Sequence, residues 1–402
     1  MNTATQETTD SAYFNVSDPN FVIHSQEVHD ARERNWFART NYGLAILRYE
    51  EMKILLRHPK LRQGSAAWPR HHGVTQGKFA DWWSEVLLNK EGPDHARLRR
   101  LVNPAFSPKV LKEMNPRFQA LAKELIDGFA AKGECEFMSE FAEPYAARVI
   151  CIMLGLPERE WHKIAKWSAT LGLALGITLK QDLPRIEEAL EGLYQYADQL
   201  IDDRKANPGD DFVSKLVLAQ RDNDALSHDE LRIMLVLLIF GGMDTTRNQL
   251  GLGMESFMQH PDQWELLAER PELASNAVAE VMRTNPTVTW VTREAIETFE
   301  FQGLQIEAGT TVHLFSQSAG TDPRAMPDTS FNIDAERPPH FGFGAGTHSC
   351  LGHFIAKSDM SIAMPLLAQH MTQVRLNGEP QWLPRSGNTG PVSLPLAFTP
   401  RE

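Results

Sequence analysis

Residues 227–260 constrain the fold of this chain more than any other segment, because their pattern predicts one uninterrupted helix. Ser227 and Glu230 form a capping box at its start, and Pro261 ends it. At about 1.5 Å per residue the helix would run roughly 48 Å, enough to cross a whole domain.

Two adjacent glycines, Gly241 and Gly242, lie inside this predicted helix and are followed by Asp244 and Thr245. Each glycine costs a helix interior about 1 kcal/mol relative to alanine, so the pair needs a physical reason. Glycines let a second helix or a large planar group press against the backbone, and a threonine hydroxyl can bond to the carbonyl four residues earlier. The pattern fits either a close helix crossing with a solvated Asp244 or a groove for a planar group.

A single cysteine, Cys350, ends a glycine-rich loop in residues 341–353 (FGFGAGTHSCLGH). Glycine lets a backbone turn with positive φ and pass close to a flat group. A cysteine where a loop becomes a helix lies near unsatisfied N–H groups that favour its thiolate, which can ligate one face of a haem iron. One alternative is a glycine-rich turn with a buried free cysteine. Another is a metal site from His348, Cys350 and His353, which lacks the separated ligand pairs of structural zinc sites.

The spacing F-G-x-G-x-H-x-C-x-G over residues 343–352 resembles the haem-binding loop of the cytochrome P450 family. Three further segments resemble that family in the same order, namely residues 92–108, 241–245 and 280–293. The resemblance covers residues 45–400. It implies the P450 fold, a helix-rich triangular prism with haem b between the long central helix and the helix after the cysteine.

The resemblance also implies roles for the two central motifs. Cys350 would be the axial ligand of the haem iron, and Gly241 and Gly242 would form the groove that holds dioxygen. Asp244 and Thr245 would relay protons to the oxygen. Proton relay suits a carboxyl group that can take up and release a proton at neutral pH, and a hydroxyl that both donates and accepts hydrogen bonds.

The other cofactor-binding residues are implied in the same way. Haem propionates need cationic or donor partners, and in this sequence those of the family correspond to His95, Arg99, Arg293 and His348. Within the loop, Gly352 follows the cysteine, and the Phe343 ring is expected to pack beside the sulfur and shield it.

Glu280 and Arg283 lie three residues apart, so they share a face of a predicted helix. They could form an ordinary surface ion pair worth under about 1 kcal/mol. In the family this pair is structural and clamps the segment before the haem loop, with a third basic residue. Arg337 is the only basic candidate near the family's usual position for that residue.

Helical periodicity also marks residues 109–131, 137–154, 184–206, 211–220, 271–285 and 351–370. Residues 45–60 predict a short strand and an amphipathic helix, and residues 288–315 predict strands. Residues 316–340 predict a long ordered loop, and residues 371–400 a terminal hairpin. The chain is therefore predicted to be mainly α with a small β portion.

Substrate contacts are expected from residues over the distal face of the haem. The candidates are apolar or aromatic with one exception, which favours a largely hydrophobic small molecule. They are Trp82, Trp83, Phe240, Met243, Val288, Trp290, Val291 and Thr389. Simple core packing is the alternative explanation for each of them.

Composition sets limits on partners and location. The net charge of −12 argues against a nucleic-acid partner, since phosphate recognition needs a basic surface. No apolar run approaches the 20 or so residues of a membrane anchor, and three cysteines favour a reducing cytoplasm over a disulfide framework. Because no linker-like stretch divides the chain, one domain over residues 1–402 is expected, with a flexible N-terminal segment over residues 1–20.

The resemblance implies a haem-thiolate monooxygenase that inserts one atom of dioxygen into its substrate. No flavin or nicotinamide domain is recognisable, so electrons from NAD(P)H are expected through a ferredoxin reductase and a small acidic ferredoxin. A docking patch for that ferredoxin is expected at Arg97, Arg100, Lys109, Lys112 and Lys357. Two alternatives are a peroxide-driven peroxygenase of the same fold, whose members typically lack the acid–alcohol pair, and a non-catalytic haem-binding sensor.

Overall fold

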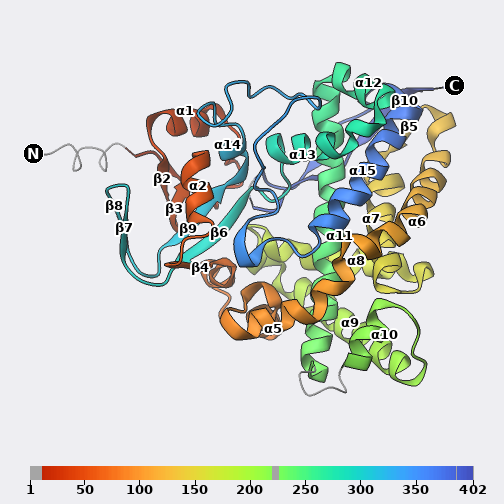
Figure 1. Cartoon of the computed structure of the whole chain (residues 1–402), viewed down its shortest axis with the longest axis horizontal. Coiled ribbons are helices and arrows are strands. Elements are labelled where there is room, and N and C mark those ends of the chain that lie inside the picture. The colour runs from red at the N-terminus through yellow and green to blue at the C-terminus, as the bar shows by residue number, and fades with distance from the viewer. Residues whose placement is uncertain (1–10, 220–225, 386, 402) are drawn as a thin grey trace, which may run out of the picture.

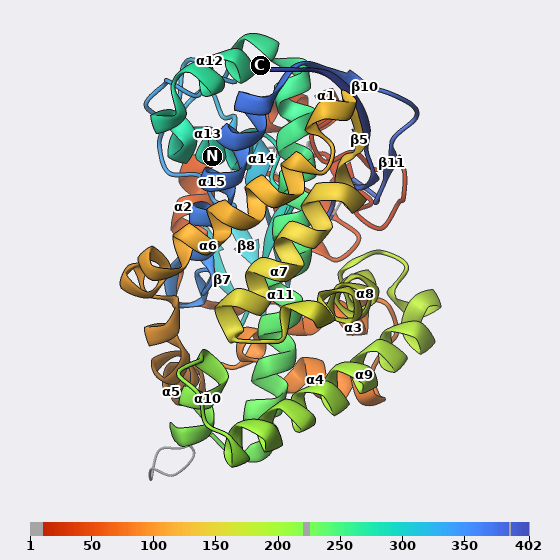
Figure 2. The ribbon, with the colours of Figure 1, turned by 90° about the vertical axis from the view of Figure 1, so that its right-hand side faces the viewer.

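The computed structural model describes residues 11–219, 226–385 and 387–401, and helix α11 (His228–Gln259) is its longest element. The capping box is present: the Ser227 hydroxyl accepts a bond from the Glu230 N–H, and the Glu230 carboxylate accepts one from the Ser227 N–H. Pro261 does not merely end the helix but begins α12 (Pro261–Glu269), because a first helical position needs no N–H. Figures 1 and 2 show α11 running through the helix-rich part of the molecule.

Helices α7 (Glu143–Leu154), α8 (Trp161–Gly172), α9 (Leu179–Ala206) and α15 (His353–His370) all contact α11. The other helices that begin before α11 are α1 (Gln26–Arg34), α2 (Tyr49–Leu55), α3 (Trp68–His71), α4 (Lys78–Glu85), α5 (Gly92–Val102), α6 (Pro108–Asp127) and α10 (Phe212–Ala219). Two more follow, α13 (Ala274–Thr284) and α14 (Ser316–Gly320). Each segment with helical periodicity contains a helix, although a π-helical turn at Met138–Ala142 precedes α7.

The main sheet has six strands in the order β1 (Tyr13–Phe14), β2 (Phe37–Thr40), β3 (Gly43–Ile46), β9 (Thr311–Phe315), β6 (Trp290–Ala295) and β4 (Leu61–Gln63). In Figure 1 this sheet lies beside the helical part and carries α1 and α2. A hairpin of β7 (Phe299–Phe301) and β8 (Leu304–Ile306) extends from it. The mainly α fold with a small β portion is as predicted.

The terminal hairpin is also present over the predicted residues, and a third strand joins it. Strand β10 (Met371–Leu376) pairs with β13 (Pro395–Pro400), and β5 (Glu134–Glu136) joins the other edge of β13. Between them, β11 (Gln381–Trp382) pairs with β12 (Pro391–Ser393). The turn after β11 brings residues 387–390 back toward the centre of the molecule, where Gly390 packs against Asn248 of α11.

Two expectations need correction. Residues 1–10 lie outside the described residues, but the rest of the segment expected to be flexible is ordered: β1 pairs with β2, and Phe14 is buried against Phe21 and Phe315. Residues 316–320 of the expected loop form helix α14. Residues 321–340, which the structure describes in full, contain neither helix nor strand.

Buried apolar side chains form one large cluster that surrounds α11 and reaches from Phe14 to Phe398. A smaller cluster lies between the main sheet and α2, and it includes Phe37, Met52 and Leu314. In the described part of the chain, no helix combines the length and apolar character needed to cross a bilayer.

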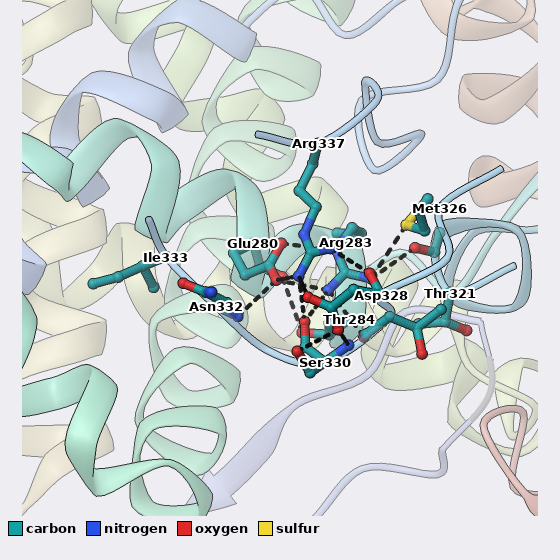
Figure 3. A network of polar contacts seen from close by, with 12 residues as sticks. Glu280, Arg283, Thr284, Thr321, Met326, Asp328, Ser330, Asn332, Ile333 and Arg337 are labelled. Atoms are coloured by element: carbon teal, nitrogen blue, oxygen red, sulfur yellow. Dashed lines mark hydrogen bonds and ion pairs between the residues drawn. The ribbon is translucent and has the colours of Figure 1, made fainter. Parts of the chain in front are cut away.

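A buried ion pair anchors the long loop to α13 (Figure 3). Arg283 donates two hydrogen bonds to the Glu280 carboxylate, at 2.7 and 2.6 Å, and the two residues are 1% and 2% exposed. The same guanidinium donates to the carbonyls of Gly320 and Ser330. Arg337 lies 3.4 Å from Glu280. The interpretation of Glu280 and Arg283 as an ordinary surface pair is therefore wrong.

We expect Arg283→Met to lower the free energy of unfolding by ~3–5 kcal/mol, because it leaves the Glu280 carboxylate buried without a partner. Urea denaturation followed by tryptophan fluorescence measures this change. The matched control is Arg270→Met, which removes an exposed arginine paired with Glu272 and Asp334 and should shift the unfolding midpoint little. Similar losses in both variants would contradict the anchoring role.

Candidate functional site

The loop that ends at Cys350 is shaped by two glycines with left-handed backbone. Gly344 and Gly346 have φ of 63° and 80°, a region that side-chain-bearing residues rarely adopt. The loop then closes on itself, because the Cys350 N–H donates to the Phe343 carbonyl at 2.9 Å. Gly352 precedes α15, so Cys350 lies just before the helix N-terminus, where the sequence predicted it.

The surroundings of Cys350 act on its thiol in opposite directions. Protein atoms around this position raise the pKa of the thiol by desolvation, while the Gly352 N–H and the Arg99 guanidinium lower it. Cys350 nevertheless remains accessible to solvent, so it is not the buried free cysteine of the alternative interpretation. The Phe343 ring lies between His340 and His353, with centroid distances of 5.5 and 6.1 Å.

A metal site made by His348, Cys350 and His353 is not formed. The His353 ring contacts the Cys350 carbonyl through Nδ1, at 2.8 Å. The His348 ring instead lies 3.2 Å from the Glu91 carboxylate. No group of three or more potential ligands is placed to hold a metal ion in residues 11–219, 226–385 and 387–401.

Two histidines from distant segments lie together beside the loop. The rings of His95, on α5, and His348 are 4.2 Å apart between centroids. Burial, with smaller contributions from His348 and Arg99, lowers the pKa of His95 to about 4, so His95 is neutral at neutral pH. The Nε2 atom of His348 is buried and has no well-directed hydrogen bond, although Glu91 is near.

Arg293, on β6, is a buried cation that forms no close ion pair with the described residues. It is 4% exposed and donates to the Gln63 side chain and to the carbonyls of Leu56 and Ala345. No carboxylate oxygen of the described residues lies within 4 Å of its guanidinium, and burial lowers its pKa to about 10, a shift that the more distant Glu91 carboxylate opposes. A buried charge is costly unless it is paired, so this position fits an anionic group.

These cations and imidazoles converge on residues 345–349. Arg293 donates to the Ala345 carbonyl, and Arg99 donates to the Ser349 carbonyl at 3.1 Å. His348 belongs to the loop itself, and His95 packs against it. One accessible thiol beside two guanidiniums and two imidazoles is a donor set that fits an iron porphyrin with two carboxylates.

The two glycines of α11 have different surroundings. A Cβ added to Gly241 would meet no atom within 4 Å, whereas one added to Gly242 would lie 2.3 Å from Cδ1 of Ile150 on α7. Gly242 therefore lies at a close helix crossing, as one interpretation predicts. Gly241 has open space beside it, which the groove interpretation requires. Thr245 donates to the Gly241 carbonyl at 3.0 Å, the bond that its spacing predicted.

The helix-crossing interpretation predicts a solvated Asp244, but the structure buries this residue. It is 4% exposed and packs against Gly172 of α8. Its carboxylate accepts from Asn388 at 2.5 Å and from Asn248 at 3.3 Å, and Arg247 lies 3.7 Å away. Burial raises its pKa, while Arg247 and Asn388 oppose this shift.

The structure brings some of the predicted substrate contacts together. Trp82 of α4 is buried with its ring edge toward Phe240, at a centroid distance of 6.2 Å, and Met243 is fully buried on the same helix as Phe240. Val288 forms a bridge with Asn388, next to Thr389. The Thr389 hydroxyl is buried and has no hydrogen-bond partner in the part of the chain that the structure describes.

Two further predicted residues, Trp83 and Trp290, pack against other side chains of the fold. Trp83 donates to the Ser65 carbonyl and stacks on Phe79. Trp290 packs against Phe315 and His313. Strand residues three apart point to opposite faces, so Trp290 faces away from Arg293. Val291 shares the face of Arg293 and lies near Gly344.

Three contributors were not predicted: Gln63, Glu91 and Asn388. Glu91 directly precedes the segment of residues 92–108 that resembles the family, so its position was a usable signal. No local pattern marks Gln63 or Asn388, because each reaches the site only through pairing of segments far apart in the chain.

The chain is similar to known proteins over nearly its whole length. A family model described as Cytochrome P450 matches residues 174–388. Luteothin monooxygenase from Streptomyces thioluteus is 36% identical over 97% of this chain and 96% of that protein. Mycinamicin IV hydroxylase/epoxidase from Micromonospora griseorubida is 34% identical over 88% of this chain and 89% of that protein.

Solved structures of other proteins have a similar fold. The crystal structure of CalO2 has a TM-score of 0.89 and 28% identity, covering 97% of this chain and 99% of CalO2. The cytochrome P450 PksS of Bacillus subtilis has a TM-score of 0.86 and 28% identity, covering 96% of this chain and all of that one.

The different surroundings of the two glycines predict opposite effects of the same substitution. Gly241→Ala should raise the stability of the haem-free protein by ~1 kcal/mol, because alanine favours the helix and the new Cβ meets nothing. Gly242→Ala should not, because its Cβ strikes Ile150. Adding Ile150→Val, which lacks the striking atom, should recover the gain when the double variant is compared with Ile150→Val alone, because shortening this buried side chain itself costs ~0.5–1.5 kcal/mol. Thermal unfolding of the parent and the four variants checks this, and equal effects of both alanines would contradict it.

Proposed function

Because the chain belongs to the cytochrome P450 family and is a monooxygenase, we propose that it oxidises a largely hydrophobic small molecule with electrons from a separate ferredoxin. The observation that carries the assignment of the site is the convergence of Arg99, Arg293, His95 and His348 on the loop of Cys350.

Haem is the cofactor of the family, and when bound it supplies the activation of dioxygen and the transfer of oxygen. In this proposal Cys350 provides the thiolate ligand, which Arg99 and the Gly352 N–H stabilise. Arg99, Arg293, His95 and His348 bind the two propionates. This arrangement gives the buried guanidinium of Arg293 the counter-ion that it lacks.

Asp244 and Thr245 are the proposed proton relay. The Thr245 hydroxyl both donates and accepts, and it lies over the Gly241 carbonyl, on the side of α11 where a Cβ would meet open space. Burial raises the pKa of Asp244, which brings a carboxyl group closer to the range in which it can take up and release a proton. The pair favours a dioxygen-dependent enzyme over the peroxygenase alternative.

The proposed substrate site includes Trp82, Phe240, Met243, Val291 and the turn of Val288 and Thr389. These side chains are apolar apart from Thr389, whose buried hydroxyl has no hydrogen-bond partner among the described residues and could bind a polar atom of the substrate. The names of the relatives support a hydrophobic substrate class: they refer to luteothin, mycinamicin IV, a polyketide and a steroid.

The proposed docking surface for ferredoxin consists of Lys109 and Lys112 on α6 and Lys357 on α15, which are all exposed. Helices α6 and α15 contact one another, and α15 follows directly on the Cys350 loop. Arg97, expected in the same patch, forms an ion pair with Glu230. Electrons would pass from NAD(P)H through a ferredoxin reductase. A cytoplasmic location is supported by Cys135 and Cys151, which are free and buried.

The haem-thiolate assignment predicts that the reduced holoenzyme gives the red-shifted Soret band of a thiolate ligand with carbon monoxide. Cys350→Ala should abolish that band, because no other thiolate is available to the iron. Cys151→Ala, which alters a fully buried cysteine, should keep it. A parent protein without the red-shifted band would refute the assignment.

The docking proposal predicts a charge effect on the reaction with ferredoxin. Lys109→Glu combined with Lys112→Glu should raise the apparent KM for a small acidic ferredoxin by about tenfold, because complementary charge steers association. The control pair, Lys163→Glu with Lys166→Glu, makes the same change with the same spacing on α8, whose described contacts are with other helices. Steady-state kinetics at two salt concentrations distinguish the two pairs. The docking surface is wrong if both behave alike.

A further inference from the structure

The turn of residues 387–390 brings an amide side chain to the buried acid of α11. Asn388 donates through Nδ2 to Oδ2 of Asp244, at 2.5 Å, although the two residues are 144 positions apart in the chain. The approach is close, because a Cβ on Gly390 would lie 2.6 Å from Cβ of Asn248. The turn therefore packs on α11 at the position of Asp244.

The other end of the same amide is also held. The Thr287 hydroxyl, which has one proton, lies 3.1 Å from Oδ1 of Asn388 and 2.7 Å from the Thr389 carbonyl oxygen, and it can donate to either. The Thr389 N–H donates to the Thr287 carbonyl at 2.9 Å, and Val288 forms a bridge with Asn388. The segment before β6 and the terminal turn thus fix Asn388 between Asp244 and Thr287.

Among the described residues, the charged groups near Asp244 lie on the side of Arg247. Arg247, on the same helix, lies 3.7 Å from its Oδ1, and Glu143 of α7 lies 3.5 Å from the far side of that guanidinium. On the side of α8 Asp244 meets Gly172. Asn248 is the second amide at the carboxylate, and its oxygen is occupied by a bond from Arg247 at 3.1 Å. Asn388 is therefore the amide whose oxygen can turn toward Asp244.

An amide in this position can serve both protonation states of a carboxyl group. When Asp244 is ionised, it accepts from Nδ2 of Asn388, as in the structure. When Asp244 is protonated, its O–H needs an acceptor. Rotation of the amide by half a turn offers Oδ1 to Asp244, and Nδ2 then donates to the Thr287 hydroxyl oxygen, whose single proton goes to the Thr389 carbonyl. The amide therefore keeps both Asp244 and Thr287 as neighbours in the two states.

We propose that Asn388 is a positioning residue for Asp244, which holds the carboxyl group in place and exchanges donor for acceptor as Asp244 releases and takes up a proton. The inference rests on the proposed proton relay through Asp244 and Thr245. It assigns to the terminal turn a part in proton delivery in addition to its contact with the proposed substrate site.

The test uses holoenzyme variants and two measurements. The first follows the infrared carboxyl band that ferric parent enzyme shows and that ferric Asp244→Asn lacks. It gives the pH midpoint at which this band is half-developed. Asn388→Ala should move this midpoint upward, because the lost N–H had stabilised the carboxylate. Asn388→Asp, which has nearly the same shape, should move it upward as well, because a second acid now lies beside Asp244.

The second measurement is NADPH oxidation with a small acidic ferredoxin and its reductase, in H2O and in D2O. Asn388→Ala should slow it by about tenfold, a fraction of what a general acid contributes, and should increase the solvent isotope effect. The matched control is Asn377→Ala. Asn377 lies on the same terminal segment and donates to the exposed Glu134 carboxylate, so its loss should change neither measurement.

The outcomes separate the inference from its premise. If Asp244→Asn leaves NADPH oxidation and its isotope effect unchanged, the relay itself is wrong, and the role of Asn388 in turnover is wrong with it. If Asp244→Asn slows the reaction while both Asn388 variants behave like Asn377→Ala, only the inference about Asn388 is overturned.

Discussion

The ion pair between Glu280 and Arg283 holds in place the long loop that leads to Cys350. Residues 321–340 have neither helix nor strand to satisfy their backbone groups, so those groups need other partners. Arg283 donates to carbonyls of this segment, and Glu280 accepts from the Asn332 N–H. At the far end of the loop, the Tyr49 hydroxyl donates to the Pro339 carbonyl. A buried ion pair offsets its desolvation only when every remaining group is bonded, and here the loop supplies those bonds.

The site on the other side of this loop has the opposite electrostatic condition. Arg293 is buried with neutral hydrogen-bond partners, and only the more distant Glu91 carboxylate opposes the effect of burial on its pKa, so the protein alone bears part of the cost of desolvating this charge. Bound propionates would relieve it, and a ligand that binds only the folded chain stabilises that chain. Residues 321–340, which Glu280 and Arg283 hold in place, thus lead into the Cys350 loop, next to a buried cation that an anionic group would stabilise.

Much of the fold and part of the site could be predicted because their signals are local. Helix α11, its capping box and the bond from Thr245 to Gly241 all follow from spacing within one helix. The Cys350 loop follows from glycines at positions that adopt positive φ. What the sequence does not indicate concerns neighbours distant in the chain. The packing of Trp290 against Phe315 and His313 depends on strand pairing that its own segment does not specify. The order of Tyr13–Phe14 depends on a partner strand that begins at Phe37.

The sequence by itself determined the family, the cysteine and the acid–alcohol pair, because these depend on residue types at fixed short spacings. Only the tertiary structure decided which of the two glycines has open space beside it and that Asp244 is buried. It also decided that Asn388 bonds to Asp244 and that Gln63 bonds to Arg293. The physical reason is that burial and hydrogen-bond partnership are properties of contacts between distant segments. A local pattern can place a side chain on a helix face, but it does not specify what packs against that face.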